Sequence, residues 1–149
     1  MKIRNYQERD LKDLPALYSQ LGYPVNQEEL EERLEKILSD QSYQLIVAEI
    51  DGKVVGFAGI CTMYMFEKSV EYIRILALVV DSDYRKQGIA GKILDYIKEW
   101  GRSEGLFAMT LNSGINSDRE NAHNFYENYG FHRGSYGFKL EINSHLKID

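Results

Sequence analysis

Residues 78–91 contain the residue types and spacing that best suit the binding of an anion. An apolar run is followed by polar residues, and Gly88 and Ala90 then open an amphipathic stretch. The first N–H groups of a helix lack partners within the helix, and the helix dipole makes that end positive. Glycine leaves room for an anion to approach the backbone, and Arg85 and Lys86 add positive charge. The pattern therefore predicts a pyrophosphate site at a strand-to-helix turn.

A strand-to-helix turn whose glycine only relieves backbone strain would give the same short pattern, so Gly88 alone does not settle the matter. Two other phosphate-binding signatures are absent from the sequence. There is no G-x-x-x-x-G-K-[ST], and there is no G-x-G-x-x-G near a first strand. These absences argue against a P-loop protein and against a dinucleotide-binding Rossmann fold.

A second group of residues, at 122–131 (AHNFYENYGF), could supply an acid. Ala122 and Tyr126 are four residues apart, so a helix would place them on one face. Phenols have pKa values near ~10, so they stay protonated at neutral pH and can donate a proton to a leaving thiolate. Core packing is the plainer interpretation for aromatic residues here, and it suits Phe125 and Phe131.

The two motifs together resemble the GNAT superfamily of N-acetyltransferases. The run RKQGIA at 85–90 is similar to the R/Q-x-x-G-x-G/A signature of that family, and A-x-x-x-Y-x-x-x-G-F is similar to its second motif. The resemblance implies acetyl-CoA as co-substrate, no metal, and Tyr126 as the general acid that protonates the coenzyme sulfur. The coenzyme-binding residues that it implies are Leu78, Val79 and Val80 for the pantetheine arm, Arg85, Lys86, Gln87, Gly88, Ile89, Ala90 and Gly91 for the pyrophosphate, and Ala122 and Tyr126 in the second motif.

The stretch that contains Arg119, Ala122 and His123 resembles the branch of aminoglycoside-type and aminoalkylphosphonate-type acetyltransferases. This resemblance implies a small-molecule primary amine as the acceptor, and it leaves a homodimer open. In this fold the first two helices, their connection and the strand hairpin line the acceptor pocket. The substrate-binding residues nominated in this way are Tyr23, Glu28, Tyr64, Glu71 and Tyr72.

The general base is not evident from the sequence. Many family members carry a carboxylate on the strand before the phosphate turn, whereas residues 74–77 here read RILA. Glu67 and Glu71 lie further back and could act only through water. Two other functions therefore stay open: acetylation of a protein lysine or N-terminus, and a coenzyme-binding regulatory module without turnover.

Hydrophobic periodicity predicts the elements that must position these residues. Strands are expected at 2–6, 43–50, 53–65, 70–80, 106–112 and 133–142, and helices from the N-cap Asp10 to Gly22, from the N-cap Asn26 through Leu38, from Gly88 to near Gly105 and over 119–128. Pro15 should delay the regular part of the first helix. The order βααβββαβαβ predicts an α/β (α+β) protein of acetyltransferase type, with a mixed, mostly antiparallel sheet flanked by helices. We expect one N-acetyltransferase domain over residues 1–149, with a parallel join between 76–80 and 106–112.

Composition limits the classes of partner. The chain has 149 residues and a formal net charge of −5, which argues against a protein that neutralises nucleic-acid phosphates. No apolar run approaches the ~20 residues that span a bilayer, and the first residues lack the apolar middle of a signal peptide. Cys61 is the only cysteine, so an intramolecular disulfide is impossible. We expect a cytoplasmic protein without nucleic-acid or membrane partners.

Overall fold

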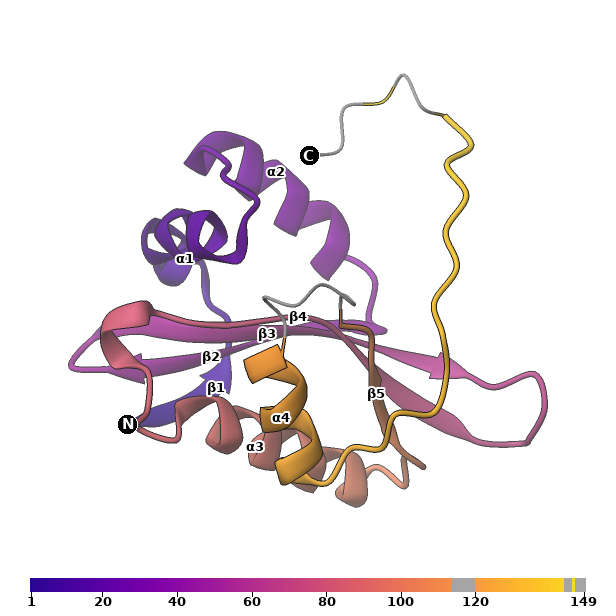
Figure 1. Ribbon diagram of the computed structural model, residues 1–149. Helices are drawn as coiled ribbons and strands as arrows, with labels where there is room; N and C mark the ends of the chain where they lie inside the picture. Colours follow the sequence, from indigo (N-terminus) through magenta and orange to yellow (C-terminus); the bar gives the residue numbers. More distant parts are fainter. Residues whose placement is uncertain (114–119, 144–145, 147–149) are drawn as a thin grey trace. The chain divides into compact units, whose positions relative to one another are not determined.

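The structure is a computed structural model that describes residues 1–113, 120–143 and 146. The chain divides into two compact units, residues 1–111 and 112–149, so its organisation as one domain stays a prediction. The first unit contains a five-stranded sheet in the order β1-β2-β3-β4-β5 (Figure 1). Its strands are β1 (Lys2–Asn5), β2 (Tyr43–Ile50), β3 (Lys53–Tyr64), β4 (Glu71–Val80) and β5 (Met109–Leu111). Strands β1 to β4 pair antiparallel, and β5 pairs parallel to β4, which confirms the predicted mixed sheet.

Helices cover both faces of this sheet in the first unit. The 3₁₀-helix η1 (Glu8–Asp13), α1 (Leu14–Leu21) and α2 (Gln27–Leu38) lie on one face, and α3 (Ile89–Ser103) lies on the other (Figure 1). As predicted, Pro15 sits in the first turn of α1, and Gly22 ends that helix with a φ of 104°. The prediction of Asp10 as an N-cap was wrong, because Asp10 lies inside η1. Among the described residues, no helix combines the length and the apolar character needed to cross a membrane.

Local signals explain where α2 and the β2–β3 hairpin begin and end. The side chain of Asn26 accepts a hydrogen bond of 2.8 Å from the N–H of Glu29, so Asn26 caps α2 as the sequence predicts. Asp51 and Gly52 connect β2 to β3 with φ values of 50° and 78°, the left-handed pair that a tight two-residue hairpin requires. Both elements are therefore placed by residues adjacent to them in sequence.

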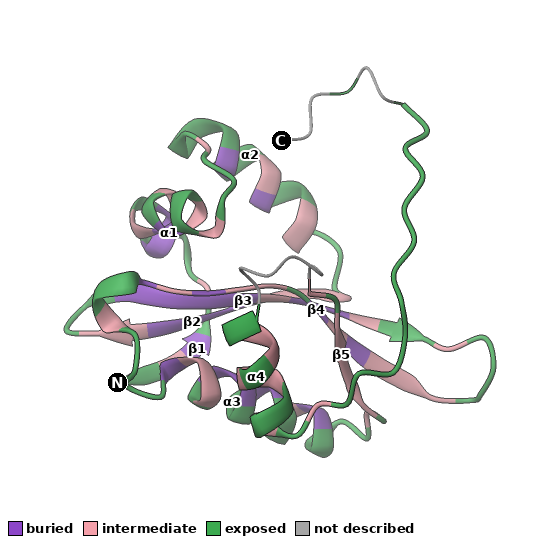
Figure 2. Ribbon diagram, in the orientation of Figure 1, coloured by how far each residue is buried: buried purple, intermediate pink, exposed green. Residues whose placement is uncertain are grey.

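Two apolar layers hold the first unit together, one on each face of the sheet (Figure 2). On one face, leucines of α1 and α2 pack in a cluster with Val47 and Phe57 of the sheet. On the other face, α3 buries Ile89, Ile93, Leu94 and Ile97. The contact of α3 with β4 is tight, because a Cβ atom added at Gly101 would lie 2.9 Å from Cδ1 of Ile73.

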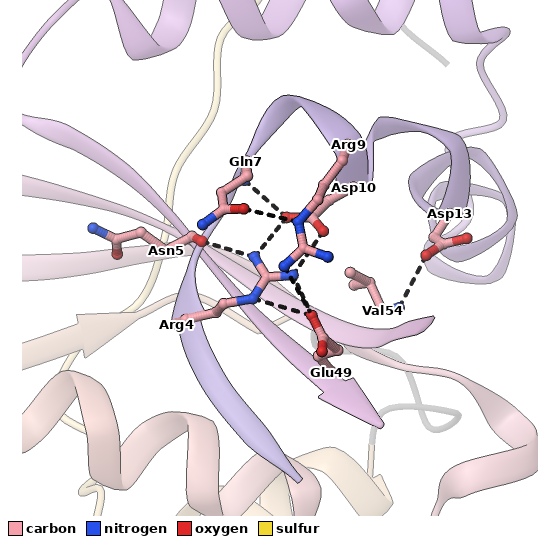
Figure 3. Close-up of polar contacts among 8 residues, drawn as sticks. All are labelled: Arg4, Asn5, Gln7, Arg9, Asp10, Asp13, Glu49 and Val54. Atoms are coloured by element: carbon pink, nitrogen blue, oxygen red, sulfur yellow. Dashed lines mark hydrogen bonds and ion pairs between the residues drawn. The ribbon is translucent and has the colours of Figure 1, made fainter. Parts of the chain in front are cut away.

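A buried ionic cluster connects β1, η1 and β2 (Figure 3). The guanidinium of Arg4 donates two hydrogen bonds to the carboxylate of Asp10, at 2.7 and 2.8 Å, and its Nε donates to Oε1 of Glu49 at 3.2 Å. Burial alone would raise the pKa of Asp10, but hydrogen bonds from Arg4 and from the N–H of Gln7 hold it below its ordinary value. The hydrogen bond from Arg4 likewise lowers the pKa of Glu49. All three charges are therefore paired inside the fold.

The second unit contains α4 (Glu120–Tyr129). Gly130 ends this helix with a φ of 128°, and the N–H groups of Gly130 and Phe131 both donate to the carbonyl of Tyr126, at 3.2 and 2.9 Å. The strand predicted at 133–142 was wrong, since residues 131–143 form no helix or strand. Its alternating apolar residues, Tyr136, Phe138, Leu140 and Ile142, are at least 86% exposed. Alternation favours a strand only where a partner edge supplies ladder hydrogen bonds, and the sequence pattern carries no information about that edge.

Candidate functional site

The site predicted from residues 78–91 begins at an open edge of β4. Strand β4 pairs with β3 along its length but with β5 only at residues 73–75. Residues 76–80 therefore have no strand partner on the β5 side within the described part of the chain. Leu78, Val79 and Val80, the predicted contacts of the coenzyme arm, lie on this stretch. Their outward backbone groups can form a ladder with a ligand that carries amides of its own.

A β-bulge at Leu76 marks the start of the open edge. Gly59 pairs with Ala77 and Ile60 pairs with Ile75, so Leu76 is an extra residue without a partner in β3. An unbroken strand would place Ile73 and Ala77 on the same face. Instead, Ile73 lies against α3, whereas Ala77 packs in the cluster with α1 and α2. The extra residue thus reverses which side chains of β4 face each layer, and it leaves Leu76 52% exposed.

The turn after β4 is fixed by the side chain of Gln20 from α1 and by its own Asp81. Oε1 of Gln20 accepts a hydrogen bond of 2.7 Å from the N–H of Ser82, and Nε2 of Gln20 lies 3.4 Å from Oδ1 of Asp81. Asp81 is buried and also accepts from the N–H of Asp83, at the start of the 3₁₀-helix η2 (Ser82–Tyr84). These bonds hold the polypeptide in position just before the predicted phosphate-binding residues.

The residues that follow have the backbone conformation of an anion-binding turn. Lys86 and Gly88 are left-handed, with φ values of 64° and 77°. Non-glycine residues adopt this conformation rarely, and it clusters at binding sites. Alternation of left-handed with other conformations turns successive N–H groups toward one side, where they form a concave site for an anion.

The N-terminus of α3 completes this site. The N–H of Lys92 makes the first α-helical bond, to the carbonyl of Gly88 at 3.0 Å, so the N–H groups of Ile89, Ala90 and Gly91 have no α-helical acceptor. A Cβ atom added at Gly88 would meet nothing within 4 Å, so the approach to these groups is clear. Arg85, Lys86 and Gln87 are exposed beside them. Nε of Arg85 donates to the carbonyl of Val80 at 3.3 Å, which directs its charge back along β4. A doubly charged pyrophosphate fits this donor set.

The second motif lies on α4, in the second unit. Ala122 and Tyr126 are both partly buried there, and the ring of Tyr126 lies 5.8 Å from that of Phe131 at an angle of 78°. Phe125 contacts both Tyr126 and Tyr129, and Phe131 contacts Tyr129, but no residue of α4 is fully buried, so core packing by Phe125 and Phe131 stays a prediction. His123 is partly buried on the same helix, and Arg119 lies outside the described residues. The role of Tyr126 as general acid stays a prediction.

The residues predicted to bind the substrate fall into two places in the first unit. Tyr23 lies in the connection between α1 and α2, and Glu28 lies in the exposed first turn of α2. Tyr64 pairs with Glu71, and the neighbouring Tyr72 belongs to the same end of the β3–β4 hairpin.

This second group lies far from the phosphate turn. Eight residues of strand separate Tyr72 from Val80, a length of about 26 Å. Glu71, one of the two carboxylates considered as a base, lies five residues before Leu76, and Glu67 lies in the connection before β4. Their roles stay predictions.

Comparison with known proteins decides the family. Residues 8–131 match the sequence profile of the "Acetyltransferase (GNAT) family". The chain belongs to the GNAT family of acetyltransferases. It is 30% identical over 143 residues to an uncharacterised N-acetyltransferase of Bacillus subtilis, YhdJ, covering 95% of this chain and 98% of that protein. The chain is therefore an acetyl-CoA-dependent N-acetyltransferase, as the two motifs predict.

Solved structures of GNAT acetyltransferases support the same fold. A GNAT family acetyltransferase of Staphylococcus aureus is 33% identical and superposes with a TM-score of 0.83, over 95% of this chain and 98% of that one. An aminoglycoside 6′-N-acetyltransferase of Acinetobacter haemolyticus has a TM-score of 0.80 over the whole of both chains, but only 14% of its residues are identical. That likeness shows a common fold.

Two features of this GNAT protein have no signal in the sequence. The hydrogen bond to Gln20 joins α1 to a turn more than 60 residues away in the chain. Because glutamines are common in surface helices, Gln20 does not stand out in the sequence. The bulge at Leu76 lies within the continuous apolar run 75–80, ILALVV, in which a reversal of faces leaves no mark. Both features become visible only when β3 and α1 are in place.

Proposed function

We propose that this acetyltransferase transfers the acetyl group of acetyl-CoA to the primary amine of a small molecule by direct attack. One observation carries the proposal: three segments that can bind a ligand follow one another along the chain. They are the open edge of β4, the left-handed turn at Lys86 and Gly88, and the N-terminus of α3. These three parts offer, in order along the chain, backbone groups for an amide-containing arm and N–H groups for a pyrophosphate. Acetyl-CoA presents its own groups in the same order.

In this proposal, the pantetheine amides bond to the backbone of residues 78–80, and the pyrophosphate receives hydrogen bonds from the turn at 85–91. Arg85 and Lys86 balance its charge. The thioester then lies toward Leu76, at the beginning of the open edge. We infer that residues 1–149 act as one catalytic domain, because the family profile at 8–131 spans both compact units.

The reaction forms one bond and breaks one. The neutral amine nitrogen bonds to the carbonyl carbon of the thioester, and the carbon–sulfur bond then breaks. The nitrogen loses one proton to water, while the leaving sulfur takes one proton from the hydroxyl of Tyr126. The phenolate regains its proton from solvent. The products are an acetamide and free coenzyme A, and the family's second motif around Tyr126 supports this assignment of the acid.

The experiment is a comparison of two tyrosines on the same helix. Tyr126→Phe should lower kcat by about 10²–10⁴-fold and change the Kd for acetyl-CoA far less, because the residue can no longer donate a proton to the leaving sulfur. Tyr129→Phe is the matched control, since its ring also lies 5.8 Å from Phe131. Release of coenzyme A thiol over a panel of amines measures turnover, and calorimetry measures binding.

Any of three results would contradict the proposal. Full activity of Tyr126→Phe would remove Tyr126 as the acid. Tight binding of acetyl-CoA without turnover on any amine would instead indicate a regulatory module. Turnover on peptide amines alone would indicate a protein acetyltransferase.

A further inference from the structure

A small cavity lies between α2 and the sheet, on the face that carries α1 and α2. Its volume is about 120 Å³, and α1, α2, β2, β3 and β4 all contribute to its wall. Phe57 and Leu45 form buried parts of the wall, and Leu38 and Tyr43 are partly exposed. None of the five residues predicted to bind the substrate lines it.

The cavity reaches the place where the proposed thioester lies. Leu76 and Ala77, the bulged residue and its neighbour, are part of its wall and also begin the open edge of β4. Because the bulge turns Ala77 toward α1 and α2, the cavity and the open edge meet at these two residues. A molecule that attacks a thioester at this end of the edge can therefore extend into the cavity.

Among the described residues, those that line the cavity include no charged side chain, and their only polar side chains are those of Tyr18, Tyr43 and Gln44. Burial raises the pKa of Tyr18, so its phenol is neutral at physiological pH. An ammonium group without a carboxylate partner would lose its hydration here and gain no ion pair in return. The wall therefore favours an apolar group and disfavours a second cation.

Volume limits the size of that group. An apolar protein cavity of about 150 Å³ holds benzene, so a cavity of about 120 Å³ accommodates roughly four to five carbon atoms. This is the size of a butyl or pentyl chain. A sugar ring with several amino groups would neither fit nor find a carboxylate partner.

We propose that this cavity binds the apolar arm of the acceptor, and that the substrates are small primary amines with one positive charge and an aliphatic arm of about four to five carbons. The inference rests on the proposed function, because it places the reacting nitrogen beside the thioester at Leu76. The proposed acceptor also differs from the polycationic acceptors of other acetyltransferases that have the same fold as this chain.

A series of straight-chain amines tests the proposal. With saturating acetyl-CoA, kcat/KM for ethylamine through octylamine should rise by about fourfold for each methylene that enters the cavity, up to about pentylamine, and then level or fall. Spermidine and an aminoglycoside should react no better than ethylamine. A flat profile, or a preference for the polycations, would overturn the proposal.

Variants at Leu38 make the test specific to the cavity. Leu38→Phe should move the optimum to shorter amines, and Leu38→Ala should move it to longer ones, so a folding defect in one variant leaves the other informative. Lys36→Phe adds the same ring to an exposed position of α2 outside the cavity, and it should keep the wild-type optimum. An optimum that stays fixed in both Leu38 variants would also overturn the proposal.

The failure of this inference differs from the failure of the proposed function. Turnover on amines with no dependence on chain length would leave acetyl transfer intact and remove the cavity as the binding site. Absence of turnover on every amine would contradict acetyl transfer itself.

Discussion

Charged and polar groups are arranged in opposite ways around Arg4 of β1 and in the turn at 85–91 after β4. The guanidinium of Arg4 is surrounded by carboxylates, and within the described residues no buried side-chain nitrogen or oxygen lacks a hydrogen-bond partner. At residues 85–91, by contrast, cations are exposed and the first N–H groups of α3 have no α-helical acceptor. The polar groups of the first region are paired within the fold, whereas those of the second are open to a ligand. Stability and coenzyme binding should therefore respond to different substitutions.

The largest expected effect is on stability, at the ionic cluster. Arg4→Met should lower the free energy of unfolding by about 3–5 kcal/mol, because it leaves the buried carboxylate of Asp10 without its partner. Urea denaturation measures the change. The control is Arg102→Met, which removes an exposed pair with Glu99 on α3 and should cost no more than about 0.5 kcal/mol. Equal losses in the two variants would break the comparison.

The next effect is on coenzyme affinity, at the turn. Gly88→Val should weaken acetyl-CoA binding by about 10–100-fold, since a side chain would displace hydrogen bonds to a charged group that are each worth about 1.5–3 kcal/mol. Gly105→Val is the control. Gly105 has a φ of 72°, close to the 77° of Gly88, and a Cβ atom added at either meets nothing within 4 Å. Both variants should therefore lose a similar ~1–2 kcal/mol of stability from backbone strain.

Calorimetry with acetyl-CoA, together with urea denaturation of both glycine variants, separates strain from binding. Unchanged affinity in Gly88→Val would mean that the pyrophosphate binds elsewhere. A matching loss of affinity in Gly105→Val would mean that the effect comes from general destabilisation.

The smallest expected effect is the loss of unfolding free energy at low pH, which tests the ionic cluster again. The folded protein holds the pKa values of Asp10 and Glu49 below their ordinary values, so the unfolded chain binds protons at higher pH than the folded one. The stability that they contribute is complete above the unfolded pKa values near ~4 and is lost as the pH falls toward the folded values. Between pH 6 and 3, unfolding free energy should fall more steeply in the wild type than in Asp10→Asn, by less than about 1.4 kcal/mol per pH unit. Asp51→Asn, in the exposed β2–β3 turn, should keep the wild-type slope.

The sequence predicts those parts of the fold that depend on neighbouring residues. The cap at Asn26, the turn at Asp51-Gly52 and the apolar stripe of α3 are all local, and all three are confirmed. The turn at 85–91 was recognisable as a candidate coenzyme site for the same reason, because its glycine and its cations are contiguous. The family that these residues indicate is also confirmed.

Features that depend on distant partners were not predictable in this way. Arg4 and Glu49 are 45 residues apart, so Asp10 looked like a helix cap when it is a member of an ionic cluster. The alternation of Tyr136, Phe138 and Leu140 looked like a strand, although no ladder forms there. The hydrophobic pattern of a segment indicates which secondary structure that segment can form. Whether it pairs depends on a second segment, and the pattern gives no information about where that segment lies.

The extra residue at Leu76 changes the path of β4 at one point and leaves the pairing on either side of it regular. Exchanging one aliphatic residue for another before or after it would alter packing by small amounts. Removing Leu76 would join Ile75 directly to Ala77, opposite the adjacent residues Ile60 and Gly59, so the other side chains of β4 would keep their present layers. What Leu76 adds to the strand is therefore local: an unpaired, 52% exposed residue and a bend at the point where the open edge of β4 begins.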